Sequence, residues 1–322
     1  MSEAARTASD PSTAEKPPTA QPPTREPKVR RLGPRARAER REAVALVIPA
    51  LLPIIVFSVI PLVSGVALGF TDATLARNDE IDFIGFGNFI DLASNRRFWA
   101  SFGIGLVWAL SVSLLTLVSA MGLALLLNAD LRLKGFTRVL ALIPWAMPPV
   151  VVAIVWRMIY STTSGPINGI LEAVGIPPVN WLGDAHVAFW TVVMVDIWHQ
   201  VSFMVVLLLA GLSALPREPY EAARVDGANA LQSFWHITLP LMLPVIVVTL
   251  LIRLIFAVRT YDLIYIMTRG GPGVATDLVS YFIYRTAFVS LNIGEASAMA
   301  IVLMAIVMAL TAFLYRYMRS LT

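Results

Sequence analysis

Six apolar segments limit what this chain can fold into more than any other feature of its sequence. At a rise of about 1.5 Å per residue, each is long enough to cross roughly 30 Å of hydrocarbon as a helix. Only 14% of the 322 residues are charged, whereas soluble domains carry about 25% charged residues. The sequence therefore predicts an all-α, polytopic membrane protein with about six transmembrane helices. The segments cover about residues 43–70, 99–127, 137–160, 186–212, 241–266 and 295–315.

Prolines lie inside two of these segments without ending them. The third segment, for example, contains Pro144, Pro148 and Pro149. Membrane helices tolerate proline because neighbouring helices can satisfy the freed carbonyl groups. We therefore expect these prolines to kink a continuous helix and to have no further role.

The segments outside the membrane carry positive charge unequally. Residues 1–42 are rich in Pro, Ala, Thr and Ser and end in a run of Lys and Arg, which predicts a disordered basic tail. The loops on the side of this tail contain Arg132, Arg217 and Arg224, whereas residues 161–185 contain no Lys or Arg. Because positive loops stay in the cytosol, both termini are expected there. The basic residues flank the spans, so no nucleic-acid partner is expected.

The loop between the fourth and fifth segments, at about residues 216–240, is the most informative one. Glu218 to Val225 suit a short amphipathic helix with acidic residues in its first turn. Gly227 permits a sharp turn. Asn229 to Ile237 suit a second short helix, which Pro240 is expected to end. Two short helices joined at a glycine predict a rigid knob that projects from the membrane.

This knob resembles the EAA loop of binding-protein-dependent ABC importer permeases. The resemblance implies a coupling helix that docks in a cleft of a cytosolic ATPase subunit, where the glutamate matched by Glu221 pairs with a basic residue. The alternative of a short amphipathic loop that lies on the bilayer stays open. The ATPase-coupling residues expected from the match are Glu221, Ala222, Ala223, Asp226, Gly227, Ala228 and Phe234.

Two further stretches resemble the carbohydrate-uptake permeases of the maltose and glycerol-phosphate type. They are Phe83 to Phe89 in the first external loop and Tyr261 to Phe288, where Arg269 departs from the usual pattern. The resemblance covers about residues 43–319 and implies a sugar importer in a bacterial cell membrane. Its implied partners are a sister permease subunit, two ATP-binding subunits and an extracytoplasmic solute-binding protein. ATP and Mg would be used by the partner ATPase, and no cofactor would bind this chain.

Five charged residues fall inside or at the edges of apolar segments. Each costs about 2.5–3.5 kcal/mol at mid-bilayer, so they should face protein or a water-filled cavity. By helical rise, Asp196 lies about 15 Å from the outer end of its helix and Arg253 about 18 Å from the inner end of its own. We therefore predict that these two residues pair. Arg259 and Asp262 are expected to meet on one face of the fifth helix. The fifth charge is Arg157.

Aromatic and polar side chains near these charges suit a sugar, because aromatic faces stack on pyranose C–H groups while hydroxyls and amides form hydrogen bonds. For the aromatic members, an anchor at the membrane interface stays an alternative. For Arg259 and Asp262, the alternative is a structural or gating role. The candidate substrate-pathway residues are Trp156, Asp196, Trp198, Gln200, Ser202, Arg259, Tyr261, Asp262 and Tyr265.

Motifs of catalysis and metal binding are missing from the sequence. It contains no Cys and no G-x-x-x-x-G-K-[ST], H-E-x-x-H or G-x-S-x-G pattern, and its three His residues are scattered. We therefore expect a transport subunit and no enzyme. Two alternatives stay open: an ABC permease for glycerol phosphate, a polyamine or a peptide, and a stand-alone secondary carrier.

Overall fold

The computed structural model describes residues 47–49, 51–76, 80–129 and 134–319. The chain divides into two compact units, residues 1–59 and 60–322. The predicted basic tail, residues 1–42, lies outside the described residues. An apolar helix long enough to cross a membrane runs over Val47–Leu68 and contains the π-helical segment η1 (Ile55–Val59).

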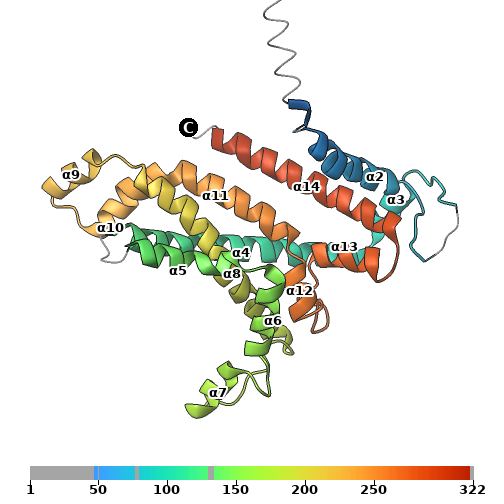
Figure 1. The fold of residues 1–322 in the computed structure, drawn as a ribbon, viewed down its shortest axis with the longest axis horizontal. Helices are drawn as coiled ribbons and strands as arrows, with labels where there is room; N and C mark the ends of the chain where they lie inside the picture. The colour runs from blue at the N-terminus through green and yellow to red at the C-terminus, as the bar shows by residue number, and fades with distance from the viewer. Residues whose placement is uncertain (1–46, 50, 77–79, 130–133, 320–322) are drawn as a thin grey trace, which may run out of the picture. The chain divides into compact units, whose positions relative to one another are not determined.

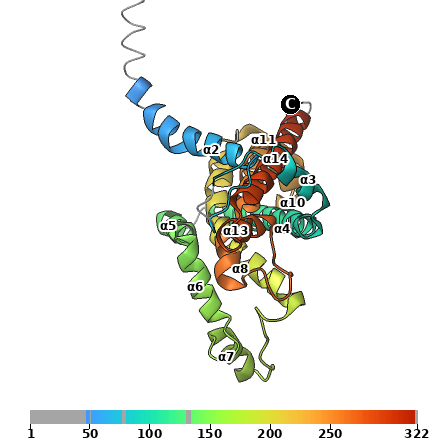
Figure 2. The same cartoon turned by 90° about the vertical axis from the view of Figure 1, so that its right-hand side faces the viewer.

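The second unit is built from helices joined by loops of varied length, and its architecture is shown in Figures 1 and 2. Its elements in chain order are α2 (Ile60–Leu68), α3 (Gly87–Ser94), α4 (Arg96–Asn128), α5 (Lys134–Ala146), α6 (Pro149–Ile159), α7 (Pro166–Ala173), α8 (Ala185–Ser213), α9 (Glu218–Val225), α10 (Ala230–Ser233), the π-helical segment η2 (Phe234–Thr238), α11 (Leu239–Arg259), α12 (Asp262–Met267), α13 (Val279–Phe288) and α14 (Ile293–Arg319).

Three long helices, α4, α8 and α11, pack against one another and form the core of this unit. One apolar cluster includes Trp108 of α4 and Ala257 of α11. A second cluster includes Ala120 of α4, Leu208 of α8 and Met242 of α11. Because the same three helices contribute to both clusters, they are held together at two levels along their length.

Side-chain caps fix where α4 and α8 begin. The Asn95 side chain accepts hydrogen bonds from the backbone N–H groups of Arg97 and Phe98, and Asp184 caps α8 in the same way. These bonds satisfy N–H groups that have no partner inside the helix. α4 therefore begins three residues before the predicted apolar segment at residue 99.

The third predicted segment is broken, so the expectation of a kinked continuous helix was wrong. α5 and α6 meet at an angle of 92° across a break at Met147 and Pro148. Pro148 and Pro149 have no N–H group, so two successive hydrogen bonds of an unbroken helix cannot form there. A single proline removes one such bond, whereas this pair allows the chain to turn through a right angle.

The fifth predicted segment also departs from expectation at both ends. At its start, one helix runs without interruption from Ala230 to Arg259, so Pro240 does not end the second short helix. A π-helical turn precedes this proline, and Leu239 N–H bonds the Phe234 carbonyl. Pro240 then lies in the first turn of α11, where a missing N–H is tolerated. At its other end, the helix stops at Arg259 and α12 begins at Asp262.

Over the described residues, five helices are long and apolar enough to cross a membrane, and the bent pair of α5 and α6 makes a sixth if it counts as one span. The unbroken helices are Val47–Leu68, Arg96–Asn128, Ala185–Ser213, Ala230–Arg259 and Ile293–Phe313. This number agrees with the sequence prediction of about six.

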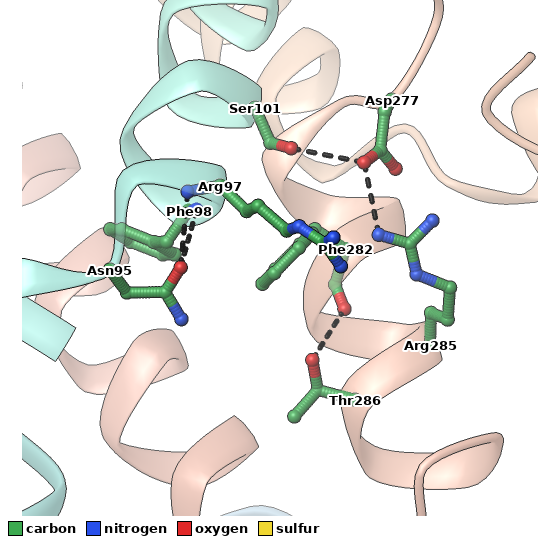
Figure 3. A network of polar contacts seen from close by, with 8 residues as sticks. All are labelled: Asn95, Arg97, Phe98, Ser101, Asp277, Phe282, Arg285 and Thr286. Atoms are coloured by element: carbon green, nitrogen blue, oxygen red, sulfur yellow. Dashed lines mark hydrogen bonds and ion pairs between the residues drawn. The ribbon is translucent and has the colours of Figure 1, made fainter. Parts of the chain in front are cut away.

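A buried carboxylate joins the loop between α12 and α13 to the start of α4 (Figure 3). Asp277 is 3% exposed, and its Oδ2 accepts hydrogen bonds from Ser101 of α4 at 3.2 Å and from Arg285 of α13 at 3.0 Å. Thr276 donates to the Gly271 carbonyl inside the same loop. The loop is therefore fixed to two helices by charge-assisted hydrogen bonds.

Replacing Asp277 by Leu removes these bonds and leaves the Ser101 hydroxyl and part of the Arg285 guanidinium without a partner. We expect a loss of about 1–3 kcal/mol, the usual cost of an unsatisfied buried group. The measurement is the thermal unfolding midpoint of the purified protein in detergent. The matched control is Glu172→Leu at an exposed carboxylate of α7, which should leave the midpoint unchanged. Equal midpoints for the two variants would contradict the role assigned to Asp277.

Candidate functional site

The knob predicted from the sequence is an ordered helix–turn–helix. α9 ends at Val225, and Gly227 follows with a φ of +79°. The N–H of Gly227 bonds the Arg224 carbonyl, and the N–H of Ala228 bonds the Ala223 carbonyl. These two bonds form a Schellman motif, in which a left-handed glycine closes the helix. A side chain at Gly227 would meet no atom within 4 Å, so the backbone conformation alone demands glycine here.

The second half of the knob is capped and braced. Asn229 and Gln232 form a capping box, with bonds of 2.8 and 2.9 Å between each side chain and the other residue's N–H. The Tyr220 hydroxyl of α9 donates to Thr238 at 3.0 Å. Because Thr238 belongs to the helix that continues into α11, α9 is tied to that helix. The knob therefore forms one piece with α11.

The outer surface of the knob combines carboxylates with exposed apolar side chains. Glu221 and Asp226 are exposed. The exposed fractions of the large apolar side chains are 89% for Val225, 67% for Leu231 and 56% for Trp235. Exposed apolar and aromatic side chains bordered by polar groups are typical of a surface that contacts another protein.

The remaining predicted coupling residues lie in this surface or directly beneath it. Ala222 is exposed, while Ala223 and Ala228 are half-buried and line a hollow of about 380 Å³ together with Asp226 and Gly227. Phe234 is half-buried and packs against the apolar cluster around Met242. The structure thus places all seven predicted coupling residues in one knob at the end of α11, shown at the left of Figure 1.

The predicted pairing of Asp196 with Arg253 is confirmed. Arg253 Nη2 donates to Asp196 Oδ2, and the two side chains are 1% and 5% exposed. The pair joins α8 to α11. Mutual neutralisation is what allows two charges to remain in an apolar core, because an unpaired buried charge is costly.

The pair belongs to a layer of buried polar side chains between the two apolar clusters, which we name the polar layer. On each of α4, α8 and α11, the sequence positions of the layer fall between the residues of one cluster and those of the other. Within the described part of the chain, the hydroxyls of Ser113, Thr116 and Ser202, and Nε and Nη1 of Arg253, have no hydrogen-bond partner. The layer consists of Ser113, Thr116, Asp196, His199, Ser202, Thr249 and Arg253.

Two predicted pathway residues, Trp156 and Trp198, form an aromatic group between α6 and α8. Their ring centroids lie 5.3 Å apart in an edge-to-face contact. Tyr160 stacks on Trp156 at 5.4 Å and contacts Trp181 at 5.5 Å. Sequence reasoning missed Tyr160 and Trp181. The i, i+4 spacing of Trp156 and Tyr160 could have found the first, whereas the contact of Trp181 depends on the loop after α7.

A second aromatic group gathers around α12 and α13. Tyr261 stacks on Tyr284 at 5.1 Å, and Tyr265 meets the same ring edge-to-face at 5.3 Å. Tyr261 and Tyr265 are each 41% exposed. Tyr284 was missed, because it lies on another helix and only the tertiary fold brings it between the two predicted tyrosines. Burial raises the pKa of the neighbouring Tyr281 hydroxyl above its ordinary value.

A third aromatic group contains residues that come after Asp196 on α8 and after Arg253 on α11. Sequence reasoning missed this group as well. Phe203 stacks on Trp145 of α5 at 5.3 Å and contacts Phe256 at 5.7 Å. Phe203 lies seven residues after Asp196, and Phe256 lies three residues after Arg253. These helical spacings place each aromatic on the face of its charged neighbour, a signal that the sequence already contained.

Two other expectations about the pathway need correction or qualification. Among the described residues, no ion pair joins Arg259 to Asp262, so their predicted meeting on one helix face was wrong. The backbone leaves the helix at Thr260, with φ −65° and ψ 113°, and the two residues lie on different helices. Ser202 is fully buried in the polar layer, and the Gln200 amide contacts the His199 ring at 3.1 Å.

The described residues contain no group of three or more His, Asp or Glu side chains that could hold a metal ion. The structure thus contains a knob suited to protein contact, the polar layer and three aromatic groups. These elements can transmit a movement and line a passage.

Comparison with known proteins gives relatives that match most of the chain. The sequence profile described as "binding-protein-dependent transport system inner membrane component" matches residues 116–321. The trehalose/maltose transport system permease protein MalF of Thermococcus litoralis is 38% identical over 271 residues, 83% of this chain and 90% of the relative. The sulfoquinovosyl glycerol transport system permease protein SmoG of Agrobacterium fabrum is 34% identical over 287 residues, 88% of this chain and 92% of the relative.

A third relative, the sn-glycerol-3-phosphate transport system permease protein UgpA of Agrobacterium fabrum, is 35% identical over 246 residues, 74% of this chain and 82% of the relative. Among solved structures, a bacterial ABC transporter that imports the acidic polysaccharide alginate has the same fold. Its TM-score is 0.78 at 23% identity, with 89% of this chain and 98% of that chain covered. A second structure, which holds an alginate pentasaccharide-bound periplasmic protein, has a TM-score of 0.77.

The pairing in the polar layer predicts a pattern of loss and rescue. Asp196→Leu or Arg253→Leu alone leaves one unpaired buried charge, which costs about 3–5 kcal/mol. We expect each single variant to lower the yield of monodisperse protein in detergent and its unfolding midpoint. The double variant leaves no charge and should regain the wild-type midpoint or exceed it, since apolar replacement of a buried pair is often neutral or stabilising. A double variant as unstable as the weaker single one would rule out the pair.

Proposed function

The chain belongs to the family of binding-protein-dependent transport system inner membrane components, and on this basis we propose that it forms half of the translocation pathway of an ATP-driven sugar importer. The recognition of an ABC importer permease from the knob is confirmed, and so is the all-α polytopic fold class. The chain is a transport subunit of the cell membrane and not an enzyme, because ATP hydrolysis is carried out by a separate subunit in this family.

The proposed assembly contains a sister permease, two ATP-binding subunits and an extracytoplasmic solute-binding protein. ATP and Mg would be used in the ATP-binding subunits. Support for this assembly comes from the alginate importer, which has the same fold and was solved with its periplasmic protein. Both termini would lie in the cytosol, because the tail and the loops on its side carry more Lys and Arg residues than the loops on the other side.

The knob carries the proposal, because its second half is continuous with a membrane helix. The helix Ala230–Arg259 runs unbroken from the knob into the core. Arg253 lies 23 residues after Ala230, about 35 Å along the axis at the usual helical rise. A push on the knob by a closing ATPase would therefore reach the Asp196–Arg253 pair along one continuous helix.

The exposed surface of the knob supports its role as the ATPase contact. Glu221 and Asp226 can meet basic side chains, and the exposed Val225, Leu231 and Trp235 can fill an apolar cleft. The transport step itself requires only that two packings of the helices differ in their affinity for the ATPase in its open and closed states.

The substrate class is proposed to be carbohydrate. The relatives MalF and SmoG are permeases of trehalose/maltose and sulfoquinovosyl glycerol transport systems. In this chain, the three aromatic groups supply faces on which sugar rings can stack. The paired Asp196 and Arg253 contribute no net charge to the core. A glycerol-phosphate substrate is a second candidate, favoured by the relative UgpA. Uptake of radiolabelled maltose, trehalose and glycerol 3-phosphate by the reconstituted importer separates the two.

Charge reversal at the knob should uncouple transport. We expect Glu221→Lys to lower ATP-driven uptake at least about tenfold, because losing one partner of a buried interfacial charge pair costs about 2–5 kcal/mol. Gly227→Val should lower uptake as well, because a β-branched residue does not fit the left-handed backbone of this turn. Both positions are exposed in the isolated chain, so membrane insertion should persist.

The measurement is uptake by proteoliposomes that contain the full transporter, together with co-purification of the ATPase. Glu172→Lys on α7 is the matched control and should transport normally. Wild-type uptake by both knob variants would contradict the coupling role. Uptake by vesicles that contain this chain alone would instead support a stand-alone carrier.

Removing the Tyr261 ring should weaken substrate recognition without uncoupling ATP hydrolysis. Stacking of an aromatic pair is worth about 0.5–1.5 kcal/mol, so we expect Tyr261→Ala to raise the KM for sugar uptake roughly three- to tenfold. Tyr261→Phe should retain most of the affinity. Trp99→Ala, which removes an aromatic outside the three groups, should not change KM. An unchanged KM in Tyr261→Ala would remove this residue from the pathway.

A further inference from the structure

The break between α5 and α6 leaves a carbonyl group that its own helix cannot satisfy. In an unbroken helix the Val151 N–H would bond the Met147 carbonyl, but here it bonds Pro148 at 3.0 Å. In a membrane an unpaired carbonyl costs several kcal/mol. The Met147 carbonyl therefore needs a partner from another part of the chain.

His199 of α8 supplies this partner. Its Nε2 lies 3.1 Å from the Met147 carbonyl oxygen, and the residue is 6% exposed. A carbonyl only accepts, so Nε2 carries the proton and donates it. Nδ1 is then the acceptor and receives a hydrogen bond from the Gln200 amide at 3.1 Å. Both ring nitrogens are occupied, and the ring is fixed in one tautomer and one orientation.

The position of His199 connects the break to the polar layer. Asp196, His199 and Ser202 recur every three residues on the buried face of α8. On α8, Asp196 binds Arg253 of α11. His199 lies three residues later on the same helix and binds the Met147 carbonyl at the end of α5. A shift of α8 against α11 would therefore be passed to the break through a rigid stretch of one helix turn.

Beyond the break, α6 is joined to α12. The two helices pack against each other, and Arg157 Nη1 donates to the Ile266 carbonyl at 3.0 Å. α12 in turn follows the end of α11, where Ser280 donates to the Thr260 carbonyl. The short helices α6 and α12 thus form a pair that branches from α5 and α11 at the two breaks. The pair carries Trp156 and Tyr265.

We propose that His199 is a positioning residue of the transporter. Its hydrogen bond to the Met147 carbonyl sets the angle between α5 and α6. This angle fixes the position of the helix pair α6–α12 relative to the Asp196–Arg253 pair. This inference rests on the proposed transport function, which supplies the reason why these helices must keep a fixed position. His199 itself contacts no substrate in this arrangement. Its task is to keep the passage residues in place while α8 and α11 move.

The test measures the angle at the break directly. The chain contains no cysteine, so Val139→Cys on α5 and Val155→Cys on α6 provide two defined sites for spin labels. Both side chains are exposed, at 61% and 40%. The label-to-label distance distribution is recorded in the nucleotide-free, fully assembled transporter with cysteine-free partner subunits, and uptake is measured on the same preparations.

His199→Gln keeps a donor and an acceptor and should retain both the narrow distance distribution and the uptake of the parent protein. His199→Leu removes both groups, so the distribution should broaden and uptake should fall about tenfold, as expected when a buried carbonyl loses its partner. His186→Leu, at an exposed histidine of the same helix, is the matched control and should behave as the parent.

A parent-like distribution in His199→Leu would overturn the proposal, and so would a broadened one in His199→Gln. If His199→Leu does not assemble, Gln200→Leu decides, because it frees the ring without removing it. A broader distribution in Gln200→Leu supports the proposal, and an unchanged one overturns it. The distance measurement needs no sugar, so its failure is distinct from a failure of the proposed carbohydrate transport.

Discussion

Between the two apolar clusters, the Asp196–Arg253 pair places opposite charges where neither could remain alone. The pair need not add stability, since desolvation of two ions consumes most of the attraction between them. A layer of leucine and methionine would hold α4, α8 and α11 at least as firmly. Within the described residues, the hydroxyls of Ser113, Thr116 and Ser202 have no hydrogen-bond partner. This is a cost that a core of apolar side chains would avoid, so stability alone does not account for the layer. Such a layer suits helices that must exchange one packing for another, since polar groups can change partners where interdigitated apolar side chains cannot.

The same accounting of polar groups explains why two of the expected spans are broken. Each break frees backbone carbonyls, and each is tolerated where a side chain of another helix reaches the freed oxygen. His199 satisfies Met147 at the first break, and Ser280 satisfies Thr260 at the second. Irregular backbone at membrane depth requires such partners. The positions of the breaks are therefore set jointly by prolines in one helix and by donors in its neighbours.

This joint dependence marks the limit of what the sequence could predict. Apolar length located the spans, and helical rise alone brought Asp196 and Arg253 to the same depth, because both quantities are local. Whether Pro148 and Pro149 kink or break a helix depends on α8, which supplies the donor from about fifty residues further along. Tyr284 lies 23 residues after Tyr261 and joins it only through the loop that Asp277 fixes. Pro240 was misjudged for a local reason, since the π-helical turn before it has no clear sequence signature. The residues of the knob could be predicted because their spacing matches a known pattern, while their contact with an ATPase remains a proposal.

The construction of the knob decides how much of a push would reach the core. A flexible loop would absorb the movement, but here the Schellman motif at Gly227, the capping box at Asn229 and the Tyr220–Thr238 bond remove the internal freedom of the turn. In the proposed mechanism the continuous helix from Ala230 to Arg259 would then carry the displacement. Its far end is the break at Thr260, which would allow α12 to stay with α6 while α11 moves along its axis. In the proposed mechanism the rigid part of the lever ends where the aromatic residues begin, so a contact at the knob would shift α11 and the charged pair relative to the aromatic residues.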